Sequence, residues 1–323
     1  MISETLGMPD KKILIHAGFH KTGTSYLQKN LFVNRDAGYD SPADRHELRN
    51  AIIRTNPFLF DAATVRNKFM PAINRSLSHQ RVPVLSHEQF TGQPAGSGYG
   101  IRRRQREISR KEVANRLHVC FPDAKVLIVI REQKEMIKSI YKYFVSGWHG
   151  KLSASIEQFL DQAPLEKGYG PLFNIDYLQY HHVIEHYQTL FGRDSVLILP
   201  YEWLRDQPLE FVNRINRFTG NKLAESVVSQ KVNQSNSAYL CTVKRHINRL
   251  LASPDKPGYY SKPEKKVSDF LLKMSRYVPE KVHIKYERKL TEKISRLTEG
   301  TFTDNNRKTE KLTGLNLSAL GYE

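Results

Sequence analysis

Short apolar runs alternate with longer amphipathic segments along the first two thirds of the chain. The runs at 13–15, 82–85, 125–130 and 195–200 are rich in Val, Ile and Leu, which is typical of strands buried on both faces of a sheet. Each run leads into a loop and then into a segment with helical spacing. This order predicts an α/β fold with a central, mostly parallel sheet flanked by helices.

Helical spacing is clearest in four places. Apolar positions recur from Tyr26 onward, and residues 110–121 form an amphipathic pattern that ends at Pro122. The segment 206–220 predicts a helix that Gly220 ends. After the strongest strand pattern, one helix face is marked by Met136, Ile137, Ile140, Tyr141 and Phe144.

Parallel strands place their following loops at one edge of the sheet, where ligands bind in folds of this class. The sequences after the four runs are GFHKTGTS, SHEQF, REQKEMIKS and YEWL. We therefore expect these four loops to meet in one crevice.

The first of these loops has the composition of an anion site. Small residues precede a predicted helix, whose first backbone N–H groups lack intrahelical partners and carry the positive end of the helix dipole. Lys21 adds a charge, and Gly23 allows close approach of the backbone. The loop departs from GxxxxGK[ST], because Thr24 stands where that motif has lysine. A generic connection between strand and helix remains the alternative.

The chain of 323 residues carries a formal charge of +17, which predicts an acidic partner such as nucleic acid, an anionic lipid surface or an acidic small molecule or polymer. Residues 244–323 contain 18 Lys and Arg against 10 Asp and Glu, and a second basic cluster lies at 102–111. Solvated helix faces are the alternative for both. We expect residues 222–323 to form a basic, mostly helical lobe packed on a core of residues 1–221, within the same domain.

Other patterns limit the classes of protein. No run approaches the roughly 18 apolar residues of a membrane span, and the first residues lack the apolar core of a signal peptide. These features predict a cytoplasmic protein and leave peripheral membrane contact open. Cys120 and Cys241 are too few for a disulfide framework. His182 and His186 lie four apart on a predicted helix without acidic or cysteine partners, so no metal site is predicted.

Two of the loops resemble the cofactor motifs of sulfotransferases that use 3′-phosphoadenosine 5′-phosphosulfate (PAPS). HAGFHKTGTSYLQ is similar to the 5′-phosphosulfate loop, and VLIVIREQKEMIKSIY to the 3′-phosphate segment, with Arg131 and Ser139 eight residues apart. LPYEWLRDQPLEFVNRINRFTG resembles a later strand and helix of the family. NNRKTEKLTGLNLSALGY resembles the ending of bacterial, carbohydrate-directed members. The resemblance implies a sulfotransferase fold of the P-loop-NTPase-like type.

The resemblance also implies roles for residues. Lys21 would contact the bridging oxygen of the leaving phosphate, Arg131 and Ser139 would hold the 3′-phosphate, and Tyr201 would reach the adenine. The product would be adenosine 3′,5′-bisphosphate, and no metal would be required. Thr22 to Ser25 would hold the 5′-phosphate. The residues of this loop implied for cofactor binding are His20, Lys21, Thr22, Gly23, Thr24, Ser25 and Tyr26.

The acceptor must lose a proton, and SHEQF offers Glu88 and His87 as the base. Carbohydrate-directed members use a glutamate in a similar pattern, so Glu88 is the preferred candidate. The leading hypothesis is a sulfotransferase acting on a hydroxyl or amine of a carbohydrate or glycan-like acceptor, an acidic one given the charge, and not on nucleic acid. A P-loop-like nucleotide kinase or NTPase, or a non-enzymatic polyanion-binding protein, remains the alternative.

Overall fold

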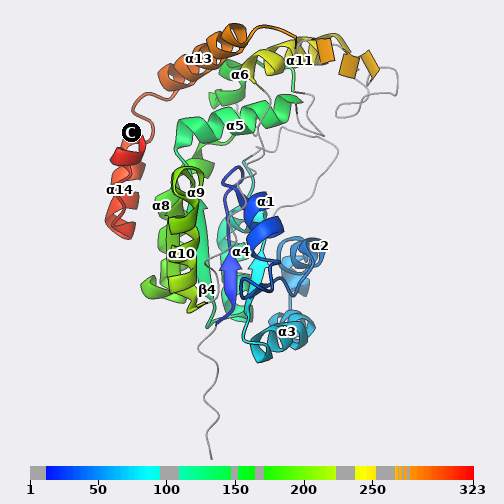
Figure 1. Cartoon of the computed structure of the whole chain (residues 1–323), viewed down its shortest axis with the longest axis vertical. Helices are drawn as coiled ribbons and strands as arrows, with labels where there is room; N and C mark the ends of the chain where they lie inside the picture. Colours follow the sequence, from blue (N-terminus) through cyan, green and yellow to red (C-terminus); the bar gives the residue numbers. More distant parts are fainter. Residues whose placement is uncertain are drawn as a thin grey trace, which may run out of the picture.

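The computed structural model describes residues 12–94, 109–146, 152–163, 171–222, 237–251, 266–267, 269–270, 273–274 and 277–323. Within these residues the centre of the fold is a five-stranded parallel sheet with the order β2-β3-β1-β4-β5 (Figure 1). The strands are β1 (Leu14–His16), β2 (Tyr39–Asp40), β3 (Val82–Ser86), β4 (Lys125–Ile130) and β5 (Val196–Pro200). The predicted fold class is confirmed.

All four apolar runs of the sequence form strands, and the run at 125–130 coincides with β4. The strand β2 was not predicted. It has two residues, which is too short for a periodic pattern, and it exists because it pairs with the first residues of β3.

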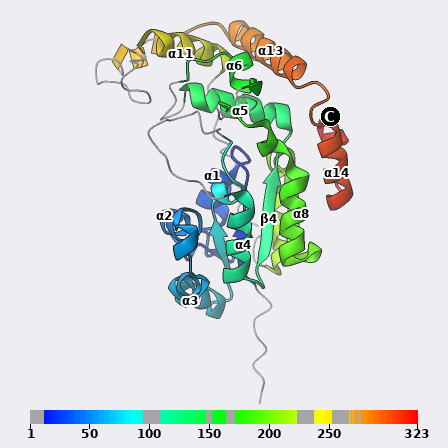
Figure 2. The ribbon, with the colours of Figure 1, turned by 180° about the vertical axis from the view of Figure 1, so that it is seen from behind.

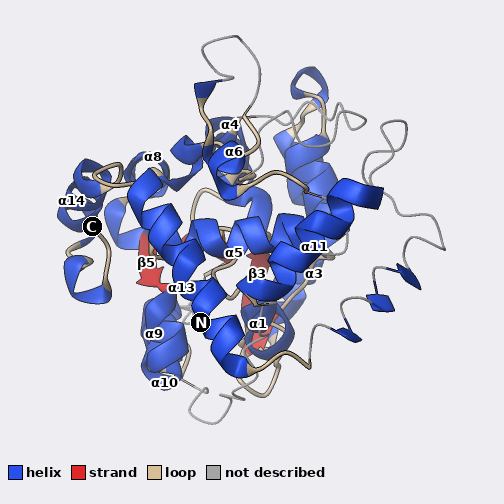
Figure 3. Ribbon diagram, turned by 90° about the horizontal axis from the view of Figure 1, so that it is seen from above, coloured by secondary structure: helices blue, strands red, loops and turns tan. Residues whose placement is uncertain are grey.

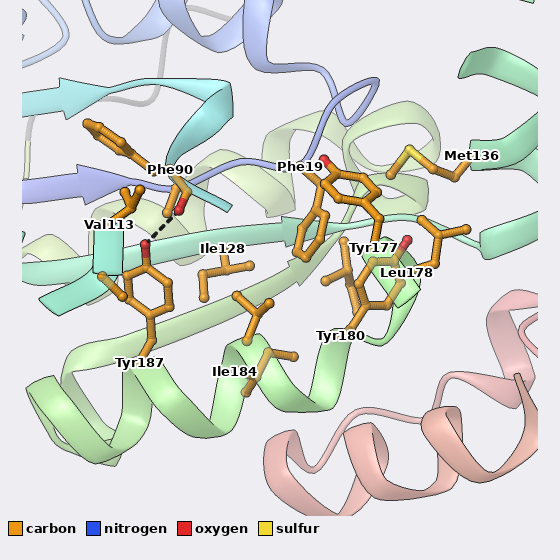
Figure 4. Close-up of a cluster of buried hydrophobic side chains, with 14 of the residues drawn as sticks. Phe19, Phe90, Val113, Ile128, Met136, Tyr177, Leu178, Tyr180, Ile184 and Tyr187 are labelled. Atoms are coloured by element: carbon orange, nitrogen blue, oxygen red, sulfur yellow. Dashed lines mark hydrogen bonds between the residues drawn. The ribbon is translucent and has the colours of Figure 1, made fainter. Parts of the chain in front are cut away.

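Successive side chains of the strands point to opposite faces of the sheet, and both faces are covered. Val126, Ile128 and Ile130 pack into one apolar cluster, whereas Leu127 and Val129 pack into another. The first face is covered by α3 (Ala62–Ser78), α4 (Arg110–Cys120) and α8 (Tyr180–Phe191). Figure 4 shows α8 contributing Tyr180, Ile184 and Tyr187 to this layer. The second face is covered by the π-helical turn Leu27–Leu31 and α10 (Pro208–Thr219).

Further helices surround the edge at which the strands end. α5 (Gln133–Ser146) crosses this edge, and α11 (Ala238–Leu251) and α13 (Glu280–Leu297) lie against α5 (Figures 1 and 2). Figure 3, seen from above, shows α5 and α13 lying over the sheet. The remaining α-helices with described bounds are α1 (Thr24–Tyr26), α2 (Arg45–Leu48), α6 (Ile156–Leu160), α9 (Tyr201–Asp206) and α14 (Thr303–Thr313). Shorter helical turns are Arg49–Arg54, Pro57–Leu59, Glu88–Thr91, Ile175–Leu178, Arg193–Ser195 and Ser318–Leu320.

The predicted helices are found with small differences at their ends. Residues 110–121 form α4, and the apolar face predicted for α5 is buried, with Phe144 only partly so. The basic cluster at 102–111 lies almost wholly outside the described residues, as does most of the glycine-rich stretch 91–100. In the part of the chain that is described, no helix is both long and apolar enough to span a membrane.

Gly220 ends α10 in the left-handed region, with φ 68°. A Cβ at this position would meet no atom within 4 Å, so the cost of a side chain is conformational and not steric. We expect Gly220→Ala to lower the free energy of unfolding by about 1 kcal/mol, measured by urea denaturation. Gly220→Asn is the matched control and should cost less, because asparagine tolerates this conformation better. Equal losses for the two variants would contradict this account.

Candidate functional site

The loop after β1 is held in shape by a hydrogen bond within the loop and by two residues in the left-handed region. The Thr22 hydroxyl donates to the Phe19 carbonyl at 2.6 Å, and Lys21 adopts a left-handed conformation with φ 65°. Gly23 has φ 80° and precedes α1, and a Cβ there would lie 2.5 Å from Leu204 Cδ2. Glycine is therefore required at 23 both for its conformation and for the close packing of α9.

The hydroxyl groups of this loop have different surroundings. Thr22 uses its hydroxyl inside the loop, and Ser25 is exposed. Thr24 is buried, and its Oγ1 has no hydrogen-bond partner among the described residues. A Cβ at Gly18 would lie 2.7 Å from this Oγ1 atom. The loop therefore holds one buried, unsatisfied hydroxyl at the start of α1, which fits an oxygen-rich ligand.

The ammonium group of Lys21 lies 3.7 Å from the centre of the Tyr143 ring on α5. Burial and the Arg131 charge lower the pKa of Lys21 to about 8, and the charge of Glu88 opposes them. Tyr143 was not predicted as a site residue. The available signal was its place on α5, one helical turn beyond Ser139, but only the fold brings it to Lys21.

Arg131 joins three of the four strand-end segments. Its Nη1 donates to the Lys21 carbonyl at 3.0 Å, and its guanidinium lies 4.8 Å from the centre of the Tyr201 ring. Its Nη2 lies 3.6 Å from Glu135 Oε2. The predicted residues Lys21, Arg131 and Tyr201 are thus brought together at one edge of the sheet.

A cavity of about 260 Å³ lies beside Arg131. Its lining residues are Arg131, Glu135, Lys138, Ser139, Lys142, Tyr201 and Glu287. Three of these were predicted for the cofactor, namely Arg131, Ser139 and Tyr201. Lys138 and Lys142 were missed, although they lie one turn apart on the helix that carries Ser139. Lys138 pairs with Glu135, and Lys142 Nζ lies 2.8 Å from Glu287 Oε1 of α13.

Glu88 lies at the start of the helical turn after β3. Arg45 Nη2 donates to both of its carboxylate oxygens, at 2.5 and 2.7 Å. Asp44 begins the helix that carries Arg45, because its side chain accepts from the N–H of His46 at 2.7 Å. Burial favours the neutral form of Glu88, but the charges of His87 and Arg45 outweigh it and lower the pKa of this carboxyl.

His87 is buried, with 3 % of its surface exposed. Its Nδ1 accepts the N–H of Gln89 at 3.0 Å, which caps the helical turn. Burial lowers the pKa of His87 to about 4, so the ring is neutral near pH 7. At neutral pH, Arg45 is therefore the charged neighbour that acts on Glu88. The buried His87 ring accepts the N–H of Gln89 and is not exposed to an acceptor substrate.

His20 links the loop after β1 to the helical turn Ile175–Leu178. Its backbone N–H donates to the Tyr177 hydroxyl at 3.0 Å, and its ring Nδ1 lies 3.1 Å from the same oxygen. Burial lowers the pKa of His20 to about 4, with Glu88 raising it and Lys21 lowering it. Lys21, His20 and Glu88 therefore lie within electrostatic reach of one another.

Tyr180 holds the backbone of the segment after β4, because its hydroxyl donates to the Arg131 carbonyl at 2.6 Å. Figure 4 shows Tyr177 and Tyr180 beside Phe19.

Two of the three histidines of α8 form hydrogen bonds with asparagine side chains. His186 Nε2 lies 3.0 Å from Asn115 Oδ1, and His181 Nδ1 lies 2.7 Å from Asn305 Oδ1. Among the described residues, no three His, Cys, Asp or Glu side chains are grouped so that they could hold a metal ion.

A family model and several solved structures are similar to this chain. Residues 10–244 match the family model described as "Sulfotransferase domain". A solved sulfotransferase from Alicyclobacillus acidocaldarius is 19% identical, with a TM-score of 0.48 over 70% of this chain and 87% of that chain. The sulfotransferase domain of the Synechococcus PCC 7002 olefin synthase is 14% identical, with a TM-score of 0.36 over 84% and 98%. A mouse sulfotransferase complexed with PAP is 13% identical, with a TM-score of 0.37 over 94% and 88%. No curated protein matches the chain.

The position of Lys21 predicts an unusual titration. After reductive methylation with ¹³C-formaldehyde, its NMR signal should titrate near pH 8, about two units below exposed lysines, because burial and Arg131 disfavour the charged form. Arg131→Met should raise the pKa of Lys21. Lys21→Arg identifies the signal by its loss. A midpoint above pH 10 in the parent protein would show that Lys21 is solvated.

Proposed function

The chain belongs to the sulfotransferase family, and from this premise we propose that it transfers the sulfuryl group of PAPS to a hydroxyl or amine of an acidic carbohydrate acceptor. The observation that carries the proposal is the contact between Arg131 and the Lys21 carbonyl. It joins the loop proposed for the 5′-phosphosulfate to the segment proposed for the 3′-phosphate. Glu88, the proposed base, acts electrostatically on Lys21 from a third loop.

The residues present fit PAPS as the cofactor. The loop from His20 to Tyr26 would hold the 5′-phosphosulfate through backbone N–H groups at the start of α1 and through the unsatisfied Thr24 hydroxyl. Arg131 and Ser139 would hold the 3′-phosphate, with Lys138 supplying a further charge from the same cavity. Tyr201 would present its ring to the adenine beside Arg131.

Bound PAPS would supply an activated sulfuryl group on a phosphate that leaves as adenosine 3′,5′-bisphosphate. Lys21 would stabilise the negative charge that grows on the leaving oxygen, which is where a positioned cation contributes most to the rate. Its lowered pKa reflects burial, and the same partial desolvation strengthens its attraction for an anion. Glu88 would accept the proton of the attacking hydroxyl or amine.

Glu88 is favoured over His87 as the base by its surroundings. The carboxylate of Glu88 is half-buried and held by Arg45, while the His87 ring is buried and occupied by the N–H of Gln89. Arg45 keeps Glu88 ionised and fixes its orientation, although the same charge reduces its basicity.

The acidic character of the acceptor is supported by charge. The chain carries +17 overall, and Arg45 places an exposed guanidinium directly beside the proposed base. A carboxylate or sulfate on the acceptor would meet this cation, and the total field would favour its approach.

We also propose that residues 1–221 and 222–323 act as one domain, with the second part packed on the catalytic core. Lys142 of α5 pairs with Glu287 of α13, and the same Glu287 oxygen accepts the N–H of Ala238 at 2.7 Å. These contacts tie α11 and α13 to the helix that carries Ser139.

Removing the guanidinium of Arg131 tests the cofactor assignment. A charge-assisted hydrogen bond to phosphate contributes roughly 1.5–3 kcal/mol, so Arg131→Ala should weaken adenosine 3′,5′-bisphosphate binding about 10- to 100-fold. Binding of adenosine 5′-phosphate should fall only a few-fold, through the lost contact to Lys21. Isothermal titration calorimetry measures both. Arg205→Ala, which removes an exposed cation on α9, is the control, and equal losses for the two ligands would refute the assignment.

The base is tested by paired substitutions in SHEQF. Glu88→Gln keeps the shape and removes the basicity, so kcat should fall about 10²- to 10⁴-fold while adenosine 3′,5′-bisphosphate still binds. His87→Asn retains an acceptor for the Gln89 N–H and should cost far less. Transfer of ³⁵S from labelled PAPS to a panel of acidic oligosaccharides measures the rates. Near-normal turnover of Glu88→Gln, with an inactive His87→Asn, would make His87 the base.

A further inference from the structure

Residues 302–323 return to the edge of the sheet that carries Arg131 and Tyr201. The helix α14 packs along α8, and Figure 1 shows it beside that helix. Beyond α14, Tyr322 is buried, with 4 % of its surface exposed. Its hydroxyl donates to Glu202 Oε2 at 3.1 Å. A residue distant in sequence thus contacts the element that carries Tyr201.

Glu202 connects two of the strand-end turns. Its other oxygen, Oε1, accepts the backbone N–H of Glu132 at 3.0 Å. Glu202 directly follows Tyr201 after β5, and Glu132 directly follows Arg131 after β4. Because Glu202 is 5 % exposed, its carboxylate depends on these protein donors in place of water. One buried carboxylate therefore bridges the two turns that carry Arg131 and Tyr201.

A second set of contacts ties the same segment to the first turn of α5. The Asn306 side chain donates to Gln133 Oε1 at 3.3 Å and to the Glu323 carbonyl at 2.6 Å. Lys134, the next residue of α5, pairs with the Glu323 carboxylate. Residues 306–323 thus contact the first turn of α5.

We propose that Tyr322 is a positioning residue for the 3′-phosphate subsite, acting through Glu202 on Arg131 and Tyr201. The inference rests on the proposed function, because it takes Arg131 as the ligand of that phosphate. Without the Tyr322 hydroxyl, Glu202 Oε2 is a buried acceptor without this donor, and the carboxylate is free to turn toward water. The N–H of Glu132 then loses its fixed partner, and the Arg131 side chain gains freedom that binding must remove.

The test compares two buried tyrosines that each lose only a hydroxyl. Tyr322→Phe should weaken adenosine 3′,5′-bisphosphate binding roughly 3- to 10-fold in calorimetry and leave adenosine 5′-phosphate binding within about twofold, since a hydrogen bond to a charged group is lost at the 3′-phosphate side. Tyr39→Phe is the matched control. The Tyr39 hydroxyl donates to Asn216 at 2.6 Å, and Tyr39 pairs with the first residue of β3, at the opposite edge of the sheet. Tyr39→Phe should lower the melting temperature without changing the affinity for adenosine 3′,5′-bisphosphate or for adenosine 5′-phosphate.

A conservative change at Glu202 separates positioning from general stability. Glu202→Gln keeps an oxygen for the Glu132 N–H and presents its amide N–H to the Tyr322 oxygen. This variant should therefore bind adenosine 3′,5′-bisphosphate more tightly than Glu202→Ala does. Unchanged affinity of Tyr322→Phe for adenosine 3′,5′-bisphosphate overturns the inference if Arg131→Ala still weakens binding. If Arg131→Ala also binds normally, the proposed 3′-phosphate site itself fails.

Discussion

The hydrogen bond from Arg131 to the carbonyl of Lys21 is the contact on which the rest of the site depends. Lys21 adopts a left-handed conformation that a residue with a Cβ rarely takes, so its backbone needs an external partner. Arg131 supplies that partner, and its side chain also lines the cavity. The position of the lysine side chain is thereby coupled to the segment proposed for the 3′-phosphate. A ligand that contacts Arg131 acts on the loop of Lys21 as well.

Carboxylates of the protein already occupy hydrogen-bond donors and cations at this edge of the sheet. Glu132 accepts the N–H groups of Lys134 and Glu135, so the protein's own carboxylate caps the start of α5. A phosphate in the neighbouring cavity therefore relies on side-chain cations, of which Arg131 and Lys138 line the wall. At the other loop, Arg45 holds Glu88 in its ionised form. Arg131, Lys138 and the candidate base Glu88 are thus each paired with a neighbour of opposite charge.

Much of the fold could be predicted because its strands are buried on both faces. A parallel sheet with helical layers on each side requires continuous apolar runs, and β4 shows this in the sequence itself. The short strand β2 could not be predicted, since a pair of residues has no period and is extended only through its partner β3. The loop after β1 was recognisable from its glycines, hydroxyls and lysine directly after a strand, and the segment after β4 from its resemblance to the 3′-phosphate segment of sulfotransferases.

The sequence by itself determined the alternation of four apolar strands with helices, the composition of the strand-end loops and the presence of Lys21, Glu88 and Arg131 within them. These features are local, because they depend on residues near one another along the chain. Only the tertiary structure decided that Tyr143 lies over Lys21, that Arg45 holds Glu88, and that His87 turns into the protein. It also decided the contact of Tyr322 with Glu202, across 120 positions of sequence. Such pairs join helices and loops whose mutual placement follows from packing on the sheet, and packing leaves no periodic signal at the residues it brings together.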